Sequence, residues 1–363
     1  MIKKQIASPV LEETNDFEST WSCDLSISQS TSTFSEFYKS QENYGHFAKR
    51  VGLISPDLGF YVNREALDDN VFINTDSLDI SEEESTFQAQ LAFDHYVETL
   101  KANKIDLEVF HQSTKAADSI FPDWFTTVRN QILPDGVLII SSMKNLERRK
   151  ERMEDTIWDL SQRYGNIVDL SFFEAQDRFL ELKGALVTDW ENGKIYCNIS
   201  ERAHEKVFDY LIDVLNNIAS KTSQKRIKGI KFRAYDKNGM KIYHTDCMMT
   251  LLNKHAVVCL DSILDKSERE TVIRELTDAD LNVRPKEIIT ISYQESENMC
   301  ANMFNILDRN NDDCVIMSRR ANSNFTKTNL DILCKNYKIV VADIDIIEQI
   351  GGGSARWMLV ELF

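Results

Sequence analysis

The sequence predicts an α/β protein in which strand and helix units repeat around a central site. Short apolar runs typical of strands alternate with amphipathic helices from Arg50 onward, and strand pairs separated by single helices recur about five times. No strand is followed by Gly-x-Gly-x-x-Gly, which disfavours two dinucleotide-binding units. We therefore expect a single body at residues 49–363, preceded by an extension at residues 1–48.

The extension at residues 1–48 is rich in Ser, Thr, Glu and Asn and shows neither helical nor strand periodicity. Such a composition is typical of a flexible arm. Aromatic side chains usually cover a surface, so we expect part of the arm to dock on the body through some of these residues: Trp21, Phe34, Phe37, Tyr38, Tyr44 and Phe47.

The strand candidates in the body are short runs of β-branched and other apolar residues. They include residues 51–54, 107–110, 137–140, 185–187, 194–196, 256–260, 288–291, 314–317 and 339–341. Two helices are indicated by apolar residues three or four positions apart, at residues 89–100 and 207–218. A third is expected to begin with a capping box formed by Ser267 and Glu270.

Composition excludes several function classes. The net charge of −16, without a basic stripe interleaved with aromatics, argues against nucleic-acid binding. No run approaches the roughly 18 apolar residues of a membrane span, and no signal peptide is visible, so we expect a cytoplasmic protein without membrane contact. The seven cysteines form no Cys-x-x-Cys pair, which indicates reduced, mostly buried thiols.

Metal and cofactor signatures are missing from the sequence. The six histidines form no zinc-type pair near a carboxylate, and no Gly-x-Ser-x-Gly is present for a serine hydrolase. The glycines before Ser354 lack the Lys-Ser/Thr of a phosphate loop. We expect neither a metal nor a cofactor.

The chain ends in a triple glycine, residues 351–353, followed by a hydrophobic run. Glycines allow positive φ and close backbone approach, so such a turn leading into a strand places the first side chains of that strand at the mouth of a pocket. Trp357 is the side chain placed there.

This terminal segment resembles the C-terminal signature of the guanidine-modifying superfamily, the pentein-fold hydrolases and amidinotransferases, and is most similar to citrulline-utilisation hydrolases and arginine deiminases. Further segments resemble the family in the same order: 118–124, 146–149, 179–181, 243–249 and 302–303. The resemblance implies a five-fold αβ-propeller, the pentein fold. It also implies an arginine- or citrulline-like small molecule as ligand, although a protein partner is possible.

The resemblance implies catalytic positions at Glu181, His244, Asp246 and Trp357. A carboxylate can accept two N–H donors of a planar guanidinium or ureido group, and Glu181 and Asp246 are the candidates. Imidazole suits proton transfer near neutral pH, which is the role of His244. On a strand, positions 244 and 246 share a side, so both could face the ligand. Alternatively, Asp246 only holds His244 through a hydrogen bond.

Ligand-binding positions carried over from the family are Asp118, Asp123, Arg148, Asn302, Gly352, Gly353 and Arg356. Some candidates have a simpler reading when taken alone. Asp118 could cap a turn or helix, and Glu181 could be a solvated strand end. Residues 182 and 183, Leu and Lys, replace small residues of the family, and the loop at Asp123 is one residue short.

The family nucleophile is a cysteine at the position of Trp357, and an indole cannot replace a thiolate. One hypothesis is therefore a pseudoenzyme that binds a ligand or regulates another protein. The alternative is an active hydrolase or transferase with a relocated nucleophile or with water activated by His244. Cys247 should point away from His244 on a strand, and Cys300 lies near a helix end. Trp357 could also be an ordinary core aromatic.

Overall fold

The computed structural model describes residues 47–363 apart from residues 69 and 224. The expectations for the N-terminal extension, including docking of its aromatic residues from Trp21 to Tyr44, lie outside the described residues, and so does Cys23.

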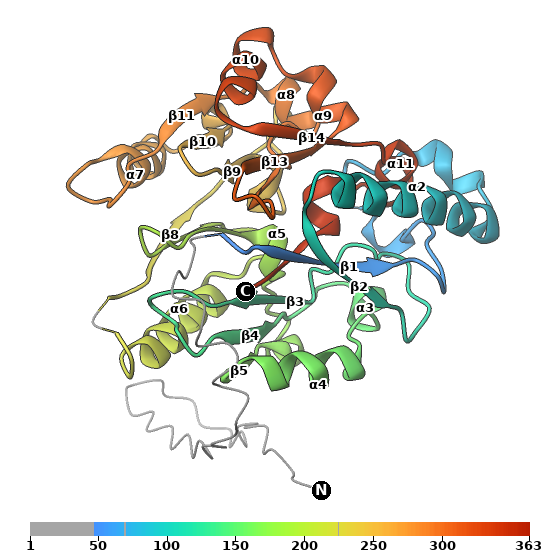
Figure 1. Ribbon diagram of the computed structural model, residues 1–363, viewed down its shortest axis with the longest axis horizontal. Helices are drawn as coiled ribbons and strands as arrows, with labels where there is room; N and C mark the ends of the chain where they lie inside the picture. The colour runs from blue at the N-terminus through green and yellow to red at the C-terminus, as the bar shows by residue number, and fades with distance from the viewer. Residues whose placement is uncertain (1–46, 69, 224) are drawn as a thin grey trace, which may run out of the picture. The chain divides into compact units, whose positions relative to one another are not determined.

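The described chain contains five three-stranded sheets that are built in the same way (Figure 1). In each sheet a middle strand pairs antiparallel with one neighbour and parallel with the other. The middle strands are β1 (Arg50–Ser55), β4 (Val137–Ile140), β7 (Lys194–Asn198), β10 (His255–Val258) and β13 (Asp313–Ser318). Their antiparallel partners are β15 (Val360–Leu362), β3 (Phe125–Val128), β6 (Leu186–Asp189), β9 (Met249–Leu251) and β12 (Phe304–Leu307). Their parallel partners are β2 (Asp106–His111), β5 (Asn166–Asp169), β8 (Lys228–Phe232), β11 (Glu287–Thr290) and β14 (Lys338–Ala342).

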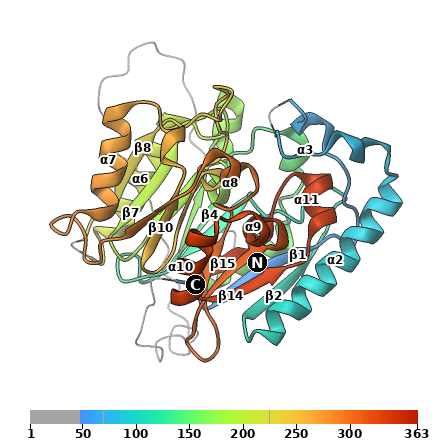
Figure 2. The same cartoon turned by 90° about the horizontal axis from the view of Figure 1, so that it is seen from above.

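A crossover helix joins each middle strand to its parallel partner, as parallel pairing requires. These helices are α2 (Glu82–Ala102), α4 (Glu154–Arg163), α6 (Glu205–Ala219), α7 (Lys266–Thr277) and α10 (Lys327–Asn336). They lie around the periphery of the sheets in both views (Figures 1 and 2). The shorter helices are α3 (Leu146–Arg149), α5 (Leu182–Ala185), α8 (Tyr293–Glu297), α9 (Arg319–Asn324) and α11 (Asp345–Gly351). The recurring strand, helix and strand units are those of the predicted α/β class.

The end of the chain completes the sheet that its first described strand begins. Strand β15 pairs antiparallel with β1, with Val51 opposite Glu361. Helix α11, which precedes the glycine turn, lies beside α2 in both views (Figures 1 and 2). The residues between α11 and β15, Trp357 among them, are therefore fixed at both ends by packed elements.

The predicted capping box at Ser267 and Glu270 is wrong. Helix α7 begins two residues earlier, with Asp265 as its N-cap, and the Asp265 carboxylate accepts a hydrogen bond from the Glu268 backbone N at 2.8 Å. Either residue type can cap a helix, so the sequence pattern alone did not fix the first turn. A capping box does occur at α8, between Ser292 and Glu295.

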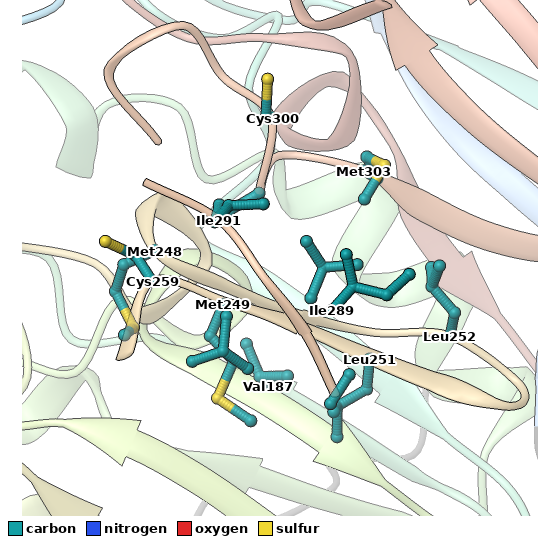
Figure 3. Close-up of a cluster of buried hydrophobic side chains, with 14 of the residues drawn as sticks. Val187, Met248, Met249, Leu251, Leu252, Cys259, Ile289, Ile291, Cys300 and Met303 are labelled. Carbon is teal, nitrogen blue, oxygen red and sulfur yellow. The ribbon is translucent and has the colours of Figure 1, made fainter. Parts of the chain in front are cut away.

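The core is apolar, and most of the described cysteines belong to it. Cys197, Cys247, Cys259, Cys300 and Cys314 are free and buried, whereas Cys334 is free and exposed. Figure 3 shows Cys259 and Cys300 in a cluster with aliphatic side chains from β9, β11 and the neighbouring loops. No helix in the described ranges has the length and apolar character to cross a membrane.

Candidate functional site

Glu181 and His244 form a buried pair. Glu181 directly precedes α5, and His244 directly precedes a 3-10 helix at Thr245–Cys247. The Glu181 Oε2 and His244 Nε2 atoms lie 2.8 Å apart, and both side chains are almost completely buried. The reading of Glu181 as a solvated strand end is therefore wrong.

Both carboxylate oxygens of Glu181 contact other residues of the protein. Its Oε1 accepts a hydrogen bond from the Lys144 backbone N at 3.1 Å, and Arg202 Nη1 lies 3.5 Å from its Oε2. Burial alone would raise the pKa of Glu181, but the charge of Arg202 and the hydrogen bond to His244 outweigh burial and lower that pKa to about 2. The carboxylate is thus placed to orient His244, whereas the sequence suggested that it binds the ligand.

Gly184, a residue that sequence reasoning missed, makes room for this imidazole. A Cβ atom at position 184 would lie 2.1 Å from His244 Nδ1. The signal was present in the sequence, because a glycine follows Glu181 by three positions. Any larger side chain would displace the ring.

Asp246 contacts the C-terminal segment rather than His244. It lies in the 3-10 helix, not on a strand, so the argument from strand alternation was wrong. Its Oδ2 accepts hydrogen bonds from Trp357 Nε1 at 2.6 Å and from Arg356 Nε at 3.1 Å. Burial raises the pKa of Asp246 to about 6, against the opposing charge of Arg356. Because Glu181 holds His244, the alternative role of Asp246 as the holder of that histidine is wrong as well.

Trp357 closes the space next to His244. It lies in a short 3-10 helix before β15, not at the start of the strand, and it is only 4% exposed. Its ring meets the His244 ring edge-on, at a centroid distance of 6.0 Å and an interplanar angle of 87°. Phe121 and Tyr243 pack against it at centroid distances of 6.5 and 6.1 Å. The indole therefore covers the histidine without separating it from Glu181.

The glycine turn allows this aromatic packing. Gly352 has a φ of +63° and ends α11 in the left-handed conformation that glycine adopts without strain. A Cβ atom at Gly353 would lie 2.7 Å from both Phe121 and Trp357. Because the glycines have no side chains, the turn leaves space for the indole.

A second charged cluster lies at the predicted acidic loop. Arg148 Nη1 donates to Asp123 Oδ2 at 2.9 Å, and Arg148 Nε donates to Glu151 Oε1 at 3.1 Å. Asp118 Oδ2 accepts a hydrogen bond from Asn63 Nδ2 at 2.7 Å. All of these side chains are buried. Asp118 begins a turn, in which its backbone carbonyl accepts a hydrogen bond from the Phe121 backbone N at 2.9 Å, so the reading as a turn residue holds and the reading as a helix cap is wrong.

Lys183 joins this cluster to the C-terminal segment. Its Nζ donates to the backbone carbonyl of Trp357 and, at 3.4 Å, to that of Arg356. The same atom lies 3.9 Å from Asp123 Oδ1. Burial lowers the pKa of Lys183 to about 8, although Asp123 and Asp246 oppose that shift. Lys183 therefore lies between two of the predicted ligand-binding residues, Asp123 and Arg356.

Several buried polar atoms of the site have no hydrogen-bond partner within the described part of the chain. They are Asp118 Oδ1, Asp123 Oδ1, Asp246 Oδ1, His244 Nδ1 and Asn302 Nδ2. The charge of Asp123 raises the pKa of both Asp118 and Asp246, after the larger effect of burial, so the three carboxylates lie within electrostatic range of one another. Unsatisfied buried acceptors are costly unless a ligand or water supplies donors.

The cysteines near the site are poor nucleophile candidates. Cys247 lies in the 3-10 helix with Asp246, where burial raises the pKa of its thiol well above the ordinary value. Burial also raises the pKa of Cys300, which packs in the apolar cluster of Figure 3. A thiol held neutral in this way is not activated for attack.

Small cavities lie beside Arg356. Two cavities bordered by Arg356 measure about 30 and 20 Å³. A water needs about 10 to 15 Å³, so each cavity holds water but not an amino acid. Within the described ranges, no group of His, Cys, Asp and Glu is arranged to hold a metal ion.

Comparisons with known proteins show the family and the fold of the chain. The profile of the family described as eukaryotic N,N dimethylarginine dimethylhydrolase matches residues 56–363. A solved structure of ArgZ, an arginine dihydrolase from the ornithine-ammonia cycle in cyanobacteria, is similar with a TM-score of 0.64 and 16% identity over 86% of this chain and 40% of ArgZ. The N-terminal domain of ArgZ bound to substrate is similar with a TM-score of 0.61 and 16% identity over 86% of this chain and 97% of that domain.

The enzyme DDAH from Pseudomonas aeruginosa, complexed with citrulline, is similar with a TM-score of 0.54 and 16% identity over 87% of this chain and 100% of the enzyme. This chain therefore spans less than half of full-length ArgZ but the whole of the smaller relative. A search of curated proteins gave no match. The structural likenesses support the pentein fold, and the family profile over residues 56–363 confirms the resemblance to the guanidine-modifying superfamily.

Proposed function

Since the chain belongs to the family of eukaryotic N,N-dimethylarginine dimethylhydrolases, we propose that it is a member without the cysteine nucleophile, which acts by binding or regulation rather than by turnover. The ligand would be an arginine- or citrulline-like small molecule, and regulation of a protein partner is a role compatible with such binding.

The observation that carries this proposal is the environment of Trp357. By the family resemblance, position 357 corresponds to the family's cysteine, and the indole there donates to Asp246 at 2.6 Å and covers the ring of His244. Indole offers no thiolate, and loss of the nucleophile in a catalytic triad costs about a millionfold in turnover. The pair of Glu181 and His244 is present, but none of the described residues packed against it offers a thiolate that could form the covalent intermediate.

The unpartnered acceptor atoms support retention of a ligand site. Asp118, Asp123 and Asp246 each have one carboxylate oxygen without a hydrogen bond among the described residues. Guanidinium and ureido groups carry several N–H donors in one plane, which suits a group of converging acceptors. Trp357 has to move before such a group can enter.

The alternative, an active enzyme with a relocated cysteine, has less support. Cys247 and Cys300 are buried thiols whose pKa values burial raises. Neither is hydrogen-bonded to His244 in a way that would activate it, because the Nε2 atom of His244 contacts Glu181 and its Nδ1 atom faces Gly184.

The test is a turnover assay on the purified full chain. Arginine, citrulline and methylated arginines are supplied, and release of ammonia, ornithine and citrulline is measured. We expect no release above the protein-free blank. Turnover that disappears in His244→Ala would establish an active enzyme at this site and contradict the proposal. Turnover that survives His244→Ala would contradict the assignment of the site as well.

A further inference from the structure

The chain contains two Asn-Gly pairs, Asn192-Gly193 and Asn238-Gly239. In such a pair the glycine has no side chain to shield its backbone nitrogen, so this nitrogen can reach the side-chain carbonyl carbon of the asparagine. Bond formation between these two atoms is the first step of the conversion of asparagine to aspartate, which consumes only water. The two pairs have different surroundings, and this difference decides which asparagine can react.

Asn238 lies in an exposed turn. Residues 237–240 are all exposed, and a Cβ atom added at Gly239 would have no neighbour within 4 Å. The backbone N of Asn238 donates to Asp236 Oδ1 at 2.9 Å, whereas no hydrogen bond within the described ranges holds its side-chain amide. Gly239 N donates to the Asp236 carbonyl at 3.0 Å. The side chain of Asn238 can therefore rotate toward Gly239 N, and a single exposed hydrogen bond of that nitrogen has to open.

Asn192, in contrast, is held by its side chain. Its Nδ2 atom donates to Asp189 Oδ2 at 2.7 Å and to the Arg284 carbonyl at 3.0 Å. Its Oδ1 atom accepts a hydrogen bond from Arg284 N at 3.1 Å. Gly193 is buried, and a Cβ atom there would lie 3.1 Å from the Arg226 carbonyl oxygen. The amide of Asn192 cannot turn toward Gly193 N unless this part of the structure opens locally.

We infer that Asn238 is a site of spontaneous deamidation and that Asn192 is protected from the same reaction. The Gly239 nitrogen forms a bond to Cγ of Asn238, and the amide nitrogen leaves as ammonia with the proton that Gly239 gives up. The resulting succinimide ring takes up one water and reopens at either of its two carbonyls. The products are aspartate and isoaspartate at position 238. This reaction does not depend on whether the candidate site binds a ligand.

The modified turn leads from β8 into the candidate site. Tyr235 forms an isolated bridge with Lys241, three residues before His244. Both products place a new carboxylate two positions from Asp236, whose Oδ1 atom accepts the backbone N–H of residues 238 and 240. Isoaspartate also adds one methylene group to the main chain. Deamidation therefore changes the charge of this connection and, in the isoaspartyl product, its length.

The experiment follows both pairs in the same molecule. The purified full chain is incubated for several weeks at mildly alkaline pH, which favours loss of the proton from the glycine nitrogen, and the peptides that contain each pair are analysed by mass spectrometry. In the folded protein we expect Asn238 to lose its amide at least about tenfold faster than Asn192, which corresponds to local protection of about 1.4 kcal/mol. Chromatography should separate two products at position 238.

Two controls isolate the cause. In concentrated urea the contacts of Asn192 are lost, so both pairs should react at similar rates. Asn238→Gln lengthens the side chain and would require a larger ring, so it should abolish the loss of the amide at position 238 in the folded protein and leave Asn192 unchanged.

The outcomes distinguish the structure from the sequence as the cause. Faster loss at Asn238 in the folded protein, with similar rates in urea, supports the inference. Equal loss at both sites in the folded protein, or faster loss at Asn192, overturns it. A difference of the same size in urea shows that the neighbouring sequence is responsible and contradicts the protection of Asn192. An intact Asn238 in the folded protein contradicts the proposed modification site.

Discussion

His244 keeps its position because residue 184 has no side chain. A Cβ atom there would lie 2.1 Å from His244 Nδ1, and the ring cannot retreat because Glu181 holds its other nitrogen at 2.8 Å. We predict that Gly184→Ala lowers the free energy of unfolding by about 1 to 3 kcal/mol, the usual cost of overpacking a core. Urea denaturation measures the change.

A double-mutant cycle checks the cause of that loss. His244→Ala removes the ring that the new methyl group would meet, so Gly184→Ala should cost much less in the His244→Ala background. An equal cost in both backgrounds would show that the backbone at position 184, and not the imidazole, is responsible.

The ionised state of Glu181 should be visible in the pH dependence of stability. Its pKa in the folded protein, about 2, lies below the ordinary value of 4.5. The carboxylate therefore contributes stability that is complete above pH 4.5 and is lost as the pH falls toward 2. The shift corresponds to roughly 3 kcal/mol.

Glu181→Gln tests this assignment, because glutamine does not ionise. We expect the parent to be more stable than Glu181→Gln at pH 7 and the difference to shrink between pH 4.5 and pH 3, as measured by urea denaturation at each pH. A difference that stays constant over this range would show that Glu181 contributes through packing alone.

Family resemblance pointed to candidate site residues in the sequence, but the sequence could not assign their contacts. Strand alternation placed His244 and Asp246 on one side of a strand, whereas the chain forms a 3-10 helix there and turns Asp246 toward Trp357. Lys183 was recognised only as a departure from the family. Its contact with the Trp357 carbonyl joins residues 174 positions apart, which no local pattern reveals.

At the scale of elements, the sequence predicted the strands that are mostly apolar. The middle strands β4 and β10 are buried at every residue and stood out as apolar runs. The strands that were missed are short and contain polar residues, such as β3 with Thr126 and Thr127 and β8 with two lysines. Their places in the sheets come from pairing with the middle strands, which is not encoded locally.

Helix α7 offers a direct test at this scale. The Asp265 carboxylate accepts a hydrogen bond from the Glu268 backbone N at 2.8 Å, and Ser267 lies within the helix. We predict that Asp265→Ala lowers the free energy of unfolding by about 1 kcal/mol, as loss of an N-cap does. Ser267→Ala is the control and should change it by less than about 0.5 kcal/mol. A larger loss of unfolding free energy in Ser267→Ala than in Asp265→Ala would indicate that Ser267 is the cap.

For the whole molecule, the pairing of β15 with β1 joins the end of the chain to the start of the body. The body at residues 49–363, separate from the extension, remains a proposal. Ala48 is buried, so the boundary is best tested by removing residues 1–46. We predict a melting temperature within a few degrees of the parent, because β1 begins only at Arg50. An insoluble or unfolded product would show that the extension is part of the core.

The central claim is that Trp357 stands in place of the nucleophile in an otherwise retained site. Its most direct test is Trp357→Cys, treated with a haloacetamidine that alkylates thiols and analysed by peptide mass spectrometry. Exposed Cys334 is the internal reference for an ordinary thiol. We expect the new thiol to be labelled faster than Cys334, and we expect added His244→Ala to remove that advantage. A new thiol labelled no faster than Cys334, with or without His244, would contradict the account.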